Sequence, residues 1–348
     1  MKLFEPKKSE IRKLQITGGS TFIVSLPKRW VVEHGLVAKD HVRVEWRPSG
    51  NLRIIPEASS ITRRREVEID LDTLPPDLAI DHLIAAYISG AAIIRVRRKH
   101  GFRSPDRKLL RRFISIGRGI EIVNESDKMI EIESLVDLGS LSIYSSLNRM
   151  YLLVRTVLKD VMNSFESGDD SNLDDIEERE NEVDALRLLI ERHIGGVLES
   201  ASLEDSAGLN RWEAAELGNL VRTMERMGDH VNQLGHLASD IERVQKIDCN
   251  VLPFTIVPSW LKLFKALNSN IKRPNLKEIH EAKDELRKNM AVLSQFEESL
   301  WERSEASDAL FLHRCSESIR RLCAYASDMA EILLNIIIHK NASMVVIE

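Results

Sequence analysis

Hydrophobic and polar residues alternate near the start of the chain, whereas apolar residues recur every three or four positions in its second half. Alternation predicts strands, and the longer period predicts amphipathic helices. In the first segment Pro27 begins a short helix and Gly35 ends it. So few residues bury too little apolar surface to fold alone, which favours oligomerisation. The elements predicted here are strands at 11–16 and 21–26, a helix at 27–35, and strands at 42–46 and 52–55.

The middle segment, residues 66–134, alternates strand and helix patterns, which predicts a small α/β domain. Between Arg95 and Arg118 it holds ten Lys or Arg residues and a single acid, Asp106. A helix from Pro105 would carry much of this charge on one face. That face is either a solvated surface or a second patch for phosphate-bearing or acidic partners. The predicted elements are a strand at 66–71, a helix at 75–90, a strand at 91–96, a helix at 104–119, and strands at 121–123 and 129–132.

Only helical patterns follow residue 138, beginning with an apolar stripe from Leu147 to Val161. Interruptions at 168–171, 200–208, 250–258 and 304–307 separate two sets of three helices. The two sets resemble each other, because Asn172–Ile176 matches Asn275–Ile279 at an offset of 103 residues. We therefore expect a six-helix bundle made of two three-helix repeats, at about 139–248 and 258–340.

Charge is divided unevenly along the chain. Residues 1–66 carry +7, residues 67–134 are neutral, and residues 135–348 carry −12, within a total of −5. A basic start can sit against phosphate backbones, which would repel the acidic remainder. Three cysteines without a CxxC pair, and no apolar run of signal-peptide or membrane-span length, lead us to expect a cytoplasmic protein.

The runs Gly18–Trp30 and His34–Val42 resemble the SpoVT/AbrB family. Members of that family form intertwined dimers of swapped hairpins, and most of them bind DNA through basic residues. The resemblance therefore implies a homodimer made through the N-terminal domain. This sequence departs from the family at Val31 and Val32, where DNA-binding members often carry a basic pair. The alternative is therefore an N-terminal domain that dimerises without binding DNA. The candidate DNA-binding residues are Arg12, Lys13, Lys28 and Arg29.

The run Met224–Asn232 is similar to the signature of the PhoU family, and Glu180–Asp184 matches that family's other acidic motif. The resemblance implies two three-helix repeats, a role in restraining phosphate uptake, and a capacity for multinuclear iron or zinc clusters at these motifs. The predicted fold class is then a multidomain α+β protein. Its predicted domains are a swapped-hairpin β domain at 1–58, a small α/β domain at 59–136, and an all-α bundle at 137–348.

Four carboxylates of these motifs are candidate metal ligands: Glu180, Asp184, Glu225 and Asp229. Residues four apart share a helix face, so two neighbouring helices would bring four anions together. Such repulsion is relieved by a bound cation, and oxygen ligands suit hard ions or iron better than a structural zinc. Gly228, costly inside a helix, indicates a close approach there, and His230 lies off this face, in an outer or solvated position.

Two observations limit the metal hypothesis. The alternative is a solvated acidic face paired with Arg179, Arg222 and Arg226. In the second repeat the equivalent positions are Lys283, Arg287, Cys323 and Ser327, so all four carboxylates are missing there. Any cluster should therefore lie in the first repeat, and it would contain iron or zinc more readily than manganese.

The leading functional hypothesis is a cytoplasmic, non-enzymatic regulator of phosphate uptake that binds DNA as a dimer. One alternative is an adaptor that restrains a phosphate transporter or sensor component at the membrane without binding DNA. The other is a metal-cluster enzyme, which lacks support because the sequence contains no Walker A loop, GxGxxG motif, nucleophile elbow or Glu-x-x-His pair typical of di-iron bundles. We expect no organic cofactor and no small-molecule substrate.

Overall fold

The computed structural model describes residues 9–46, 50–57, 64–300 and 306–342. These residues divide into two compact units, one ending at Arg64 and the other starting at Arg65. The second unit contains a small sheet domain and a helical bundle, and it holds every buried residue of the described chain.

The first unit has the predicted order of strand, strand, helix, strand, strand. β1 pairs antiparallel with β2, and β3 pairs antiparallel with β4, as two separate hairpins. The second predicted strand ends early, at Ile23, and the residues up to Pro27 form no regular structure. None of the described residues of this unit is buried. The elements are β1 (Gln15–Thr17), β2 (Thr21–Ile23), α1 (Lys28–Glu33), β3 (Val42–Trp46) and β4 (Leu52–Pro56).

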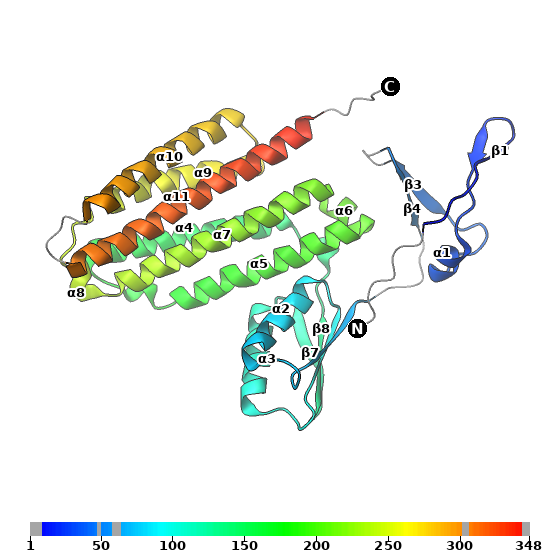
Figure 1. Ribbon diagram of the computed structural model, residues 1–348, viewed down its shortest axis with the longest axis horizontal. Coiled ribbons are helices and arrows are strands. Elements are labelled where there is room, and N and C mark those ends of the chain that lie inside the picture. The colour runs from blue at the N-terminus through cyan, green and yellow to red at the C-terminus, as the bar shows by residue number, and fades with distance from the viewer. Residues whose placement is uncertain (1–8, 47–49, 58–63, 301–305, 343–348) are drawn as a thin grey trace. The chain divides into compact units, whose positions relative to one another are not determined.

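The second unit begins with a four-stranded sheet in the order β5-β6-β8-β7, in which only β5 and β6 are parallel. Helices α2 and α3 lie on the same side of this sheet (Figure 1). Their apolar faces enclose a core that includes Tyr87 and Phe113, and Leu188 from a bundle helix completes it. The elements are β5 (Glu66–Asp70), η1 (Pro76–Leu78), α2 (Ala79–Ile88), β6 (Ile93–Arg97), α3 (Ser104–Ile116), β7 (Ile120–Glu125) and β8 (Met129–Ser134).

The rest of the unit is a bundle of two sets of three long helices, as predicted: α4, α5 and α7, then α9, α10 and α11 (Figure 1). The interruption expected at 200–208 is instead a short helix, because Ser200 caps its start and Gly208, at φ +62°, ends it. The elements are η2 (Leu138–Ser140), α4 (Ile143–Ser167), η3 (Ser171–Leu173), α5 (Ile176–Glu199), α6 (Ala201–Ala207), α7 (Arg211–Ala238), α8 (Ile241–Val244), η4 (Phe254–Ile256), α9 (Val257–Asn270), α10 (Leu276–Ser299) and α11 (Ala306–Asn341).

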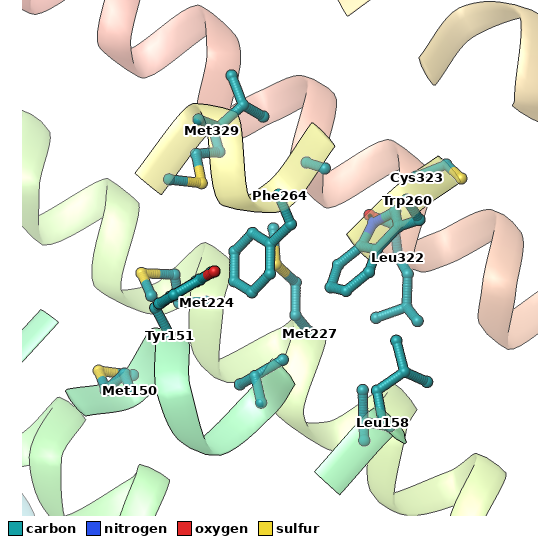
Figure 2. Packing of buried hydrophobic residues seen from close by; sticks show 14 of the residues in the cluster. Met150, Tyr151, Leu158, Met224, Met227, Trp260, Phe264, Leu322, Cys323 and Met329 are labelled. Atoms are coloured by element: carbon teal, nitrogen blue, oxygen red, sulfur yellow. Dashed lines mark hydrogen bonds between the residues drawn. The ribbon is translucent and has the colours of Figure 1, made fainter. Parts of the chain in front are cut away.

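One continuous hydrophobic core joins the two repeats (Figure 2). Phe264 of α9 stacks on Trp260 at 4.7 Å between ring centroids and meets Tyr151 of α4 at 4.9 Å. The indole Nε1 of Trp260 donates to the carbonyl oxygen of Leu322 in α11 at 2.8 Å. Burial of this large residue is therefore achieved without an unpaired N–H group, and the repeats cannot separate without exposing it.

Helix α11 is long and apolar enough to cross a membrane by length and composition alone. In the bundle 56% of its most apolar window is buried against the neighbouring helices. The apolar residues of α11 are thus explained by its central position in the bundle.

Candidate functional site

Helices α5 and α7 pack closely because glycines of α7 face apolar side chains of α5. A Cβ atom on Gly228 would lie 3.3 Å from Cγ1 of Val183, and one on Gly235 would overlap Cδ1 of Ile176. The close approach predicted at Gly228 is therefore that of helix α7 to helix α5. It brings the acidic stretches of α5 and α7 side by side (Figure 1).

The four predicted carboxylates lie in this region, two on each helix, and each is half-buried. Burial, followed by the negative charge of Asp229, raises the pKa of Glu225 to about 7. Burial, with the charges of Asp229 and Asp184, also raises the pKa of Glu180. The same two causes, burial and Asp184, raise the pKa of Asp229. These mutual effects mean that the four groups repel one another when ionised.

Two side chains that the sequence did not single out contact the carboxylates. Nε of Arg187 lies 3.2 Å from Oε1 of Glu225, and its Nη1 donates to Glu191 at 3.2 Å. The side-chain nitrogen of Asn232, which is buried, donates to Glu180. Helical spacing places both beside the acidic face, because Arg187 follows Asp184 by three residues and Asn232 follows Asp229 by three. It does not give their partners, since each contacts a carboxylate of the other helix.

The arginines considered as partners of these carboxylates contact other side chains. Arg179 contacts Asp160 at 2.6 Å, and Arg222 contacts Glu191 at 2.6 Å. The guanidinium of Arg226 lies 5.9 Å from the ring centroid of Tyr325. Arg226 still acts on the group, because its charge lowers the pKa of Glu225 and of Asp229, and Arg187 forms an ion pair with Glu225.

Two histidines of α7 occupy different surroundings. His230 is half-buried, and its Nδ1 lies 3.5 Å from the hydroxyl of Ser318 in the second repeat. Burial lowers the pKa of His230, and its ring also lies 5.8 Å from that of Tyr325. His236 is exposed, and its charge lowers the pKa of Glu180.

The four carboxylates of α5 and α7 are suited to a metal by their chemistry more than by their geometry. Within the described ranges, no three His, Cys, Asp or Glu side chains converge closely enough to hold a metal ion. The four carboxylates nevertheless carry raised pKa values, and a bound cation would relieve their repulsion. Their chemistry suits a cation bound through oxygen ligands.

The basic face of α3 borders this acidic region. Nη2 of Arg118 lies 3.4 Å from Oε1 of Glu182, which also accepts two hydrogen bonds from Arg149. Burial raises the pKa of Asp184, and the charges of Arg187 and Arg112 oppose that rise. Arg112 of α3, and Arg118 just beyond the end of α3, thus lie near acidic residues of α5.

A buried arginine joins the sheet domain to helix α5. Arg192 of α5 donates to the carbonyl oxygens of Tyr87 and Ala91 at 2.5 and 2.9 Å, at the end of α2. The hydroxyl of Tyr87 in turn donates to the carbonyl of Arg118 at 2.8 Å. Helix α5 therefore carries both the acidic residues and the contact that positions the sheet domain.

The second repeat has structural contacts at the positions equivalent to the carboxylates. Lys283 pairs with Glu331 of α11 at 2.7 Å, and Arg287 lies 3.8 Å from Asp284. Cys323 and Ser327 are buried in the core. These residues offer no carboxylate to a cation.

In the first unit, two of the candidate DNA-binding cations are paired with acids. Arg12 contacts Glu10, and Arg29 contacts Glu33 at 2.7 Å. Lys13 and Lys28 are exposed and form no ion pair within the described part of the chain. Large apolar residues accompany them at the surface, including Trp46, whose exposed fraction is 84%.

Two family models match this chain. Residues 147–243 match the PhoU domain, and residues 15–62 match the family described as antidote-toxin recognition MazE, bacterial antitoxin. The chain carries a PhoU-like domain. It also carries a MazE-like domain, in the segment where the sequence resembles the SpoVT/AbrB family. The PhoU match covers α5 and α7 with all four carboxylates.

Among solved structures, a match is the crystal structure of PhoU from Pseudomonas aeruginosa. It is 14% identical, with a TM-score of 0.46, and the match covers 57% of this chain and 96% of that one. No curated protein matches the chain.

Proposed function

We propose that this protein is a dimeric regulator of phosphate homeostasis that binds DNA through its N-terminal unit. The observation that carries the proposal is a MazE-like unit, none of whose described residues is buried, in the same chain as a PhoU-like domain. The first supplies a module for dimerisation and DNA contact, and the second supplies the link to phosphate. The protein acts in the cytoplasm and is not an enzyme.

Dimerisation is supported by the surface of the first unit. Phe22, Val37 and Trp46 have exposed fractions of 66%, 71% and 84%. Exposed aromatic and β-branched residues on so small a unit mark an interaction surface. A second copy of the same unit is the partner that covers them, which makes folding of the unit dependent on association.

DNA contact is supported by the exposed charges of Lys13 and Lys28, neither of which forms an ion pair with another described residue. Salt-dependent binding to phosphates requires such cations. Arg12 and Arg29 would have to exchange Glu10 and Glu33 for phosphate oxygens, which makes their contribution smaller.

The PhoU-like repeat would hold a metal centre through Glu180, Asp184, Glu225 and Asp229. The bound metal, iron or zinc in preference to manganese, would supply positive charge that offsets the repulsion among these groups. Arg187 opposes that repulsion in part, and Asn232 orients Glu180. No organic cofactor is required.

A second function has its own support. Val31 and Val32 stand where a basic pair would contact DNA, and two of the four candidate cations are paired within the unit. In that case the protein would be an adaptor for a phosphate transporter or sensor component at the membrane. Its N-terminal unit would only dimerise.

Transcript profiling under high and low phosphate tests the proposal and separates the two functions. A deletion strain should misregulate phosphate-responsive genes, and a strain with the Lys13→Ala/Lys28→Ala variant should reproduce much of that change. Phosphate-responsive transcripts that are unaltered in the deletion strain would overturn the proposal. A deletion effect that the double variant does not reproduce would favour the adaptor.

A further inference from the structure

A cavity of about 310 Å³ opens between the first turn of α4 and the C-terminal end of α9. Its lining contains hydroxyl, amide and cationic groups but no carboxylate. The residues that line it are Tyr144, Asn148, Asn268, Ser269, Lys272 and Arg273, with Ile271 beside them. A recess of this composition on an acidic bundle is suited to an anion.

The loop that carries the two cations is held in place by a buried side chain. Asn270, 2% exposed, accepts a hydrogen bond from the backbone N–H of Asn275 at 2.6 Å. Its side-chain nitrogen donates to the carbonyl of Ala266 at 2.9 Å and to Glu278 at 3.0 Å. The backbone of Lys272 and Arg273 is therefore fixed before any ligand arrives, which lowers the cost of binding.

The two cations are not needed to end α9. The carbonyl of Asn268 accepts from the N–H of Ile271, and the carbonyl of Ser269 accepts from the N–H groups of Lys272 and Arg273. Backbone groups thus satisfy the end of the helix, where a basic side chain could otherwise have served. Both side chains are exposed, and neither forms an ion pair within residues 64–300 or 306–342.

One amide oxygen in the lining has no hydrogen-bond partner among the described residues. Nδ2 of Asn268 donates to Oδ1 of Asn148 at 3.2 Å, whereas Oδ1 of Asn268 is buried without a hydrogen bond. Turning the amide over would leave a nitrogen unpaired instead. A buried polar atom without a partner is costly, and a polar ligand in the cavity is one way to satisfy it.

We propose that this cavity binds a small phosphate-bearing anion, either free phosphate or a phosphomonoester. The guanidinium of Arg273 and the ammonium of Lys272 are groups that bind phosphate oxygens. A phosphate group occupies only part of the volume, and the remainder accommodates the organic part of an ester. The proposal extends the regulatory function proposed above and rests on it for its biological meaning, but its test involves no DNA.

Occupancy of the cavity would be sensed by other helices through Tyr144. The hydroxyl of Tyr144 donates to Oε1 of Glu213 in α7 at 2.8 Å, and the same oxygen accepts from Lys340 of α11 at 2.6 Å. A ligand against Tyr144 therefore adjoins a hydrogen-bonded group that reaches both repeats.

Isothermal titration of the full-length protein in phosphate-free buffer tests the proposal, with inorganic phosphate and glucose 6-phosphate as the probes. We expect at least one probe to bind, and the Lys272→Gln/Arg273→Gln variant to weaken it at least tenfold. The matched control is Lys262→Gln/Lys265→Gln, which removes two exposed cations of α9 outside the cavity. The control should bind as the natural protein does.

The two probes distinguish the sources of the ligand. Tighter binding of inorganic phosphate identifies free phosphate, and tighter binding of glucose 6-phosphate identifies a phosphomonoester. If the double variant does not fold, as judged by its melting curve, Asn268→Asp replaces it by placing a negative charge in the cavity, and it should abolish binding. No binding of either probe at millimolar concentration to folded protein overturns the proposal. Equal loss in the control variant overturns it as well.

Discussion

The guanidinium of Arg192 lies 4.8 Å from the ring centroid of Tyr87 and donates a hydrogen bond to the carbonyl oxygen of that same residue. Arg192 is 5% exposed and has no ion-pair partner among the described side chains. Its charge is stabilised by two carbonyl oxygens at the end of α2 and by the face of an aromatic ring, both of which attract cations. This arginine therefore fixes the sheet domain to α5.

Replacing Arg192 with Ala should destabilise the second unit by about 2–4 kcal/mol, because two carbonyl groups lose charged donors inside the protein. Chemical denaturation monitored by circular dichroism measures the loss. Lys159→Ala, which removes an exposed cation of α4, should change the free energy of unfolding by no more than about 0.5 kcal/mol. Equal effects of the two substitutions would contradict the role assigned to Arg192.

The carboxylate group should make the metal-free protein less stable as pH rises. Glu225 has a folded pKa of about 7, above the value of about 4.3 expected when unfolded. Between these values Glu225 binds more protons in the folded state than in the unfolded state, so its contribution to stability decreases with rising pH. His193 and His230, whose pKa values burial lowers, contribute in the opposite direction. Melting curves of metal-free protein at pH 5 and pH 7.5 measure the difference.

Glu225→Gln should stabilise metal-free protein at pH 7.5 by on the order of 1 kcal/mol, since it removes one of the repelling charges. The same substitution should reduce the stabilisation gained on adding ferrous iron or zinc. Glu285→Gln, which removes an exposed acid of α10, is the control and should have neither effect. If iron and zinc stabilise Glu225→Gln as much as the natural protein, Glu225 is not a ligand.

The DNA-binding prediction concerns the dependence of affinity on salt. Lys13→Ala/Lys28→Ala should weaken DNA binding and reduce the slope of log K against log salt by about 2, because each phosphate contact contributes about 0.9. Gel-shift titrations at several salt concentrations give both quantities. Lys262→Ala, in the bundle, should leave the slope unchanged, and a double variant with an unaltered slope would exclude these lysines from the interface.

The packing of α5 against α7 can be tested at Gly235. Adding a Cβ atom by Gly235→Ala should destabilise the bundle by about 1–3 kcal/mol, because that atom overlaps Cδ1 of Ile176. Ile176→Val removes the overlapping methyl group. The double variant should therefore be more stable than Gly235→Ala alone, and a double-mutant cycle of unfolding free energies measures the coupling.

Much of the fold could be predicted because apolar periodicity alone separates strands from long helices. The stripe from Leu147 to Val161 and the carboxylates spaced four apart both follow from helical geometry, and the structure has helices at both places. The helix α6 was missed because Ser200 and Gly208 resemble loop residues as strongly as they resemble caps.

The partners of the carboxylates could not be predicted from spacing within one helix. Arg179, Arg222 and Arg187 all lie within reach of an acid along the sequence, and the rotation of α5 against α7 decides which of them forms the pair. The cavity beside Asn268 could not be predicted either, because its walls come from α4 and α9, and the lining residues Asn148 and Asn268 are 120 positions apart in the sequence.

The side chain of Leu188 makes the sheet domain and the helical bundle depend on each other. It belongs to the bundle helix α5, yet it is buried in the core of the sheet domain. A gene fusion that took the helices without the sheet would leave this leucine and the charge of Arg192 facing water. The segment that keeps both side chains buried therefore begins near Arg65, at the start of the second unit.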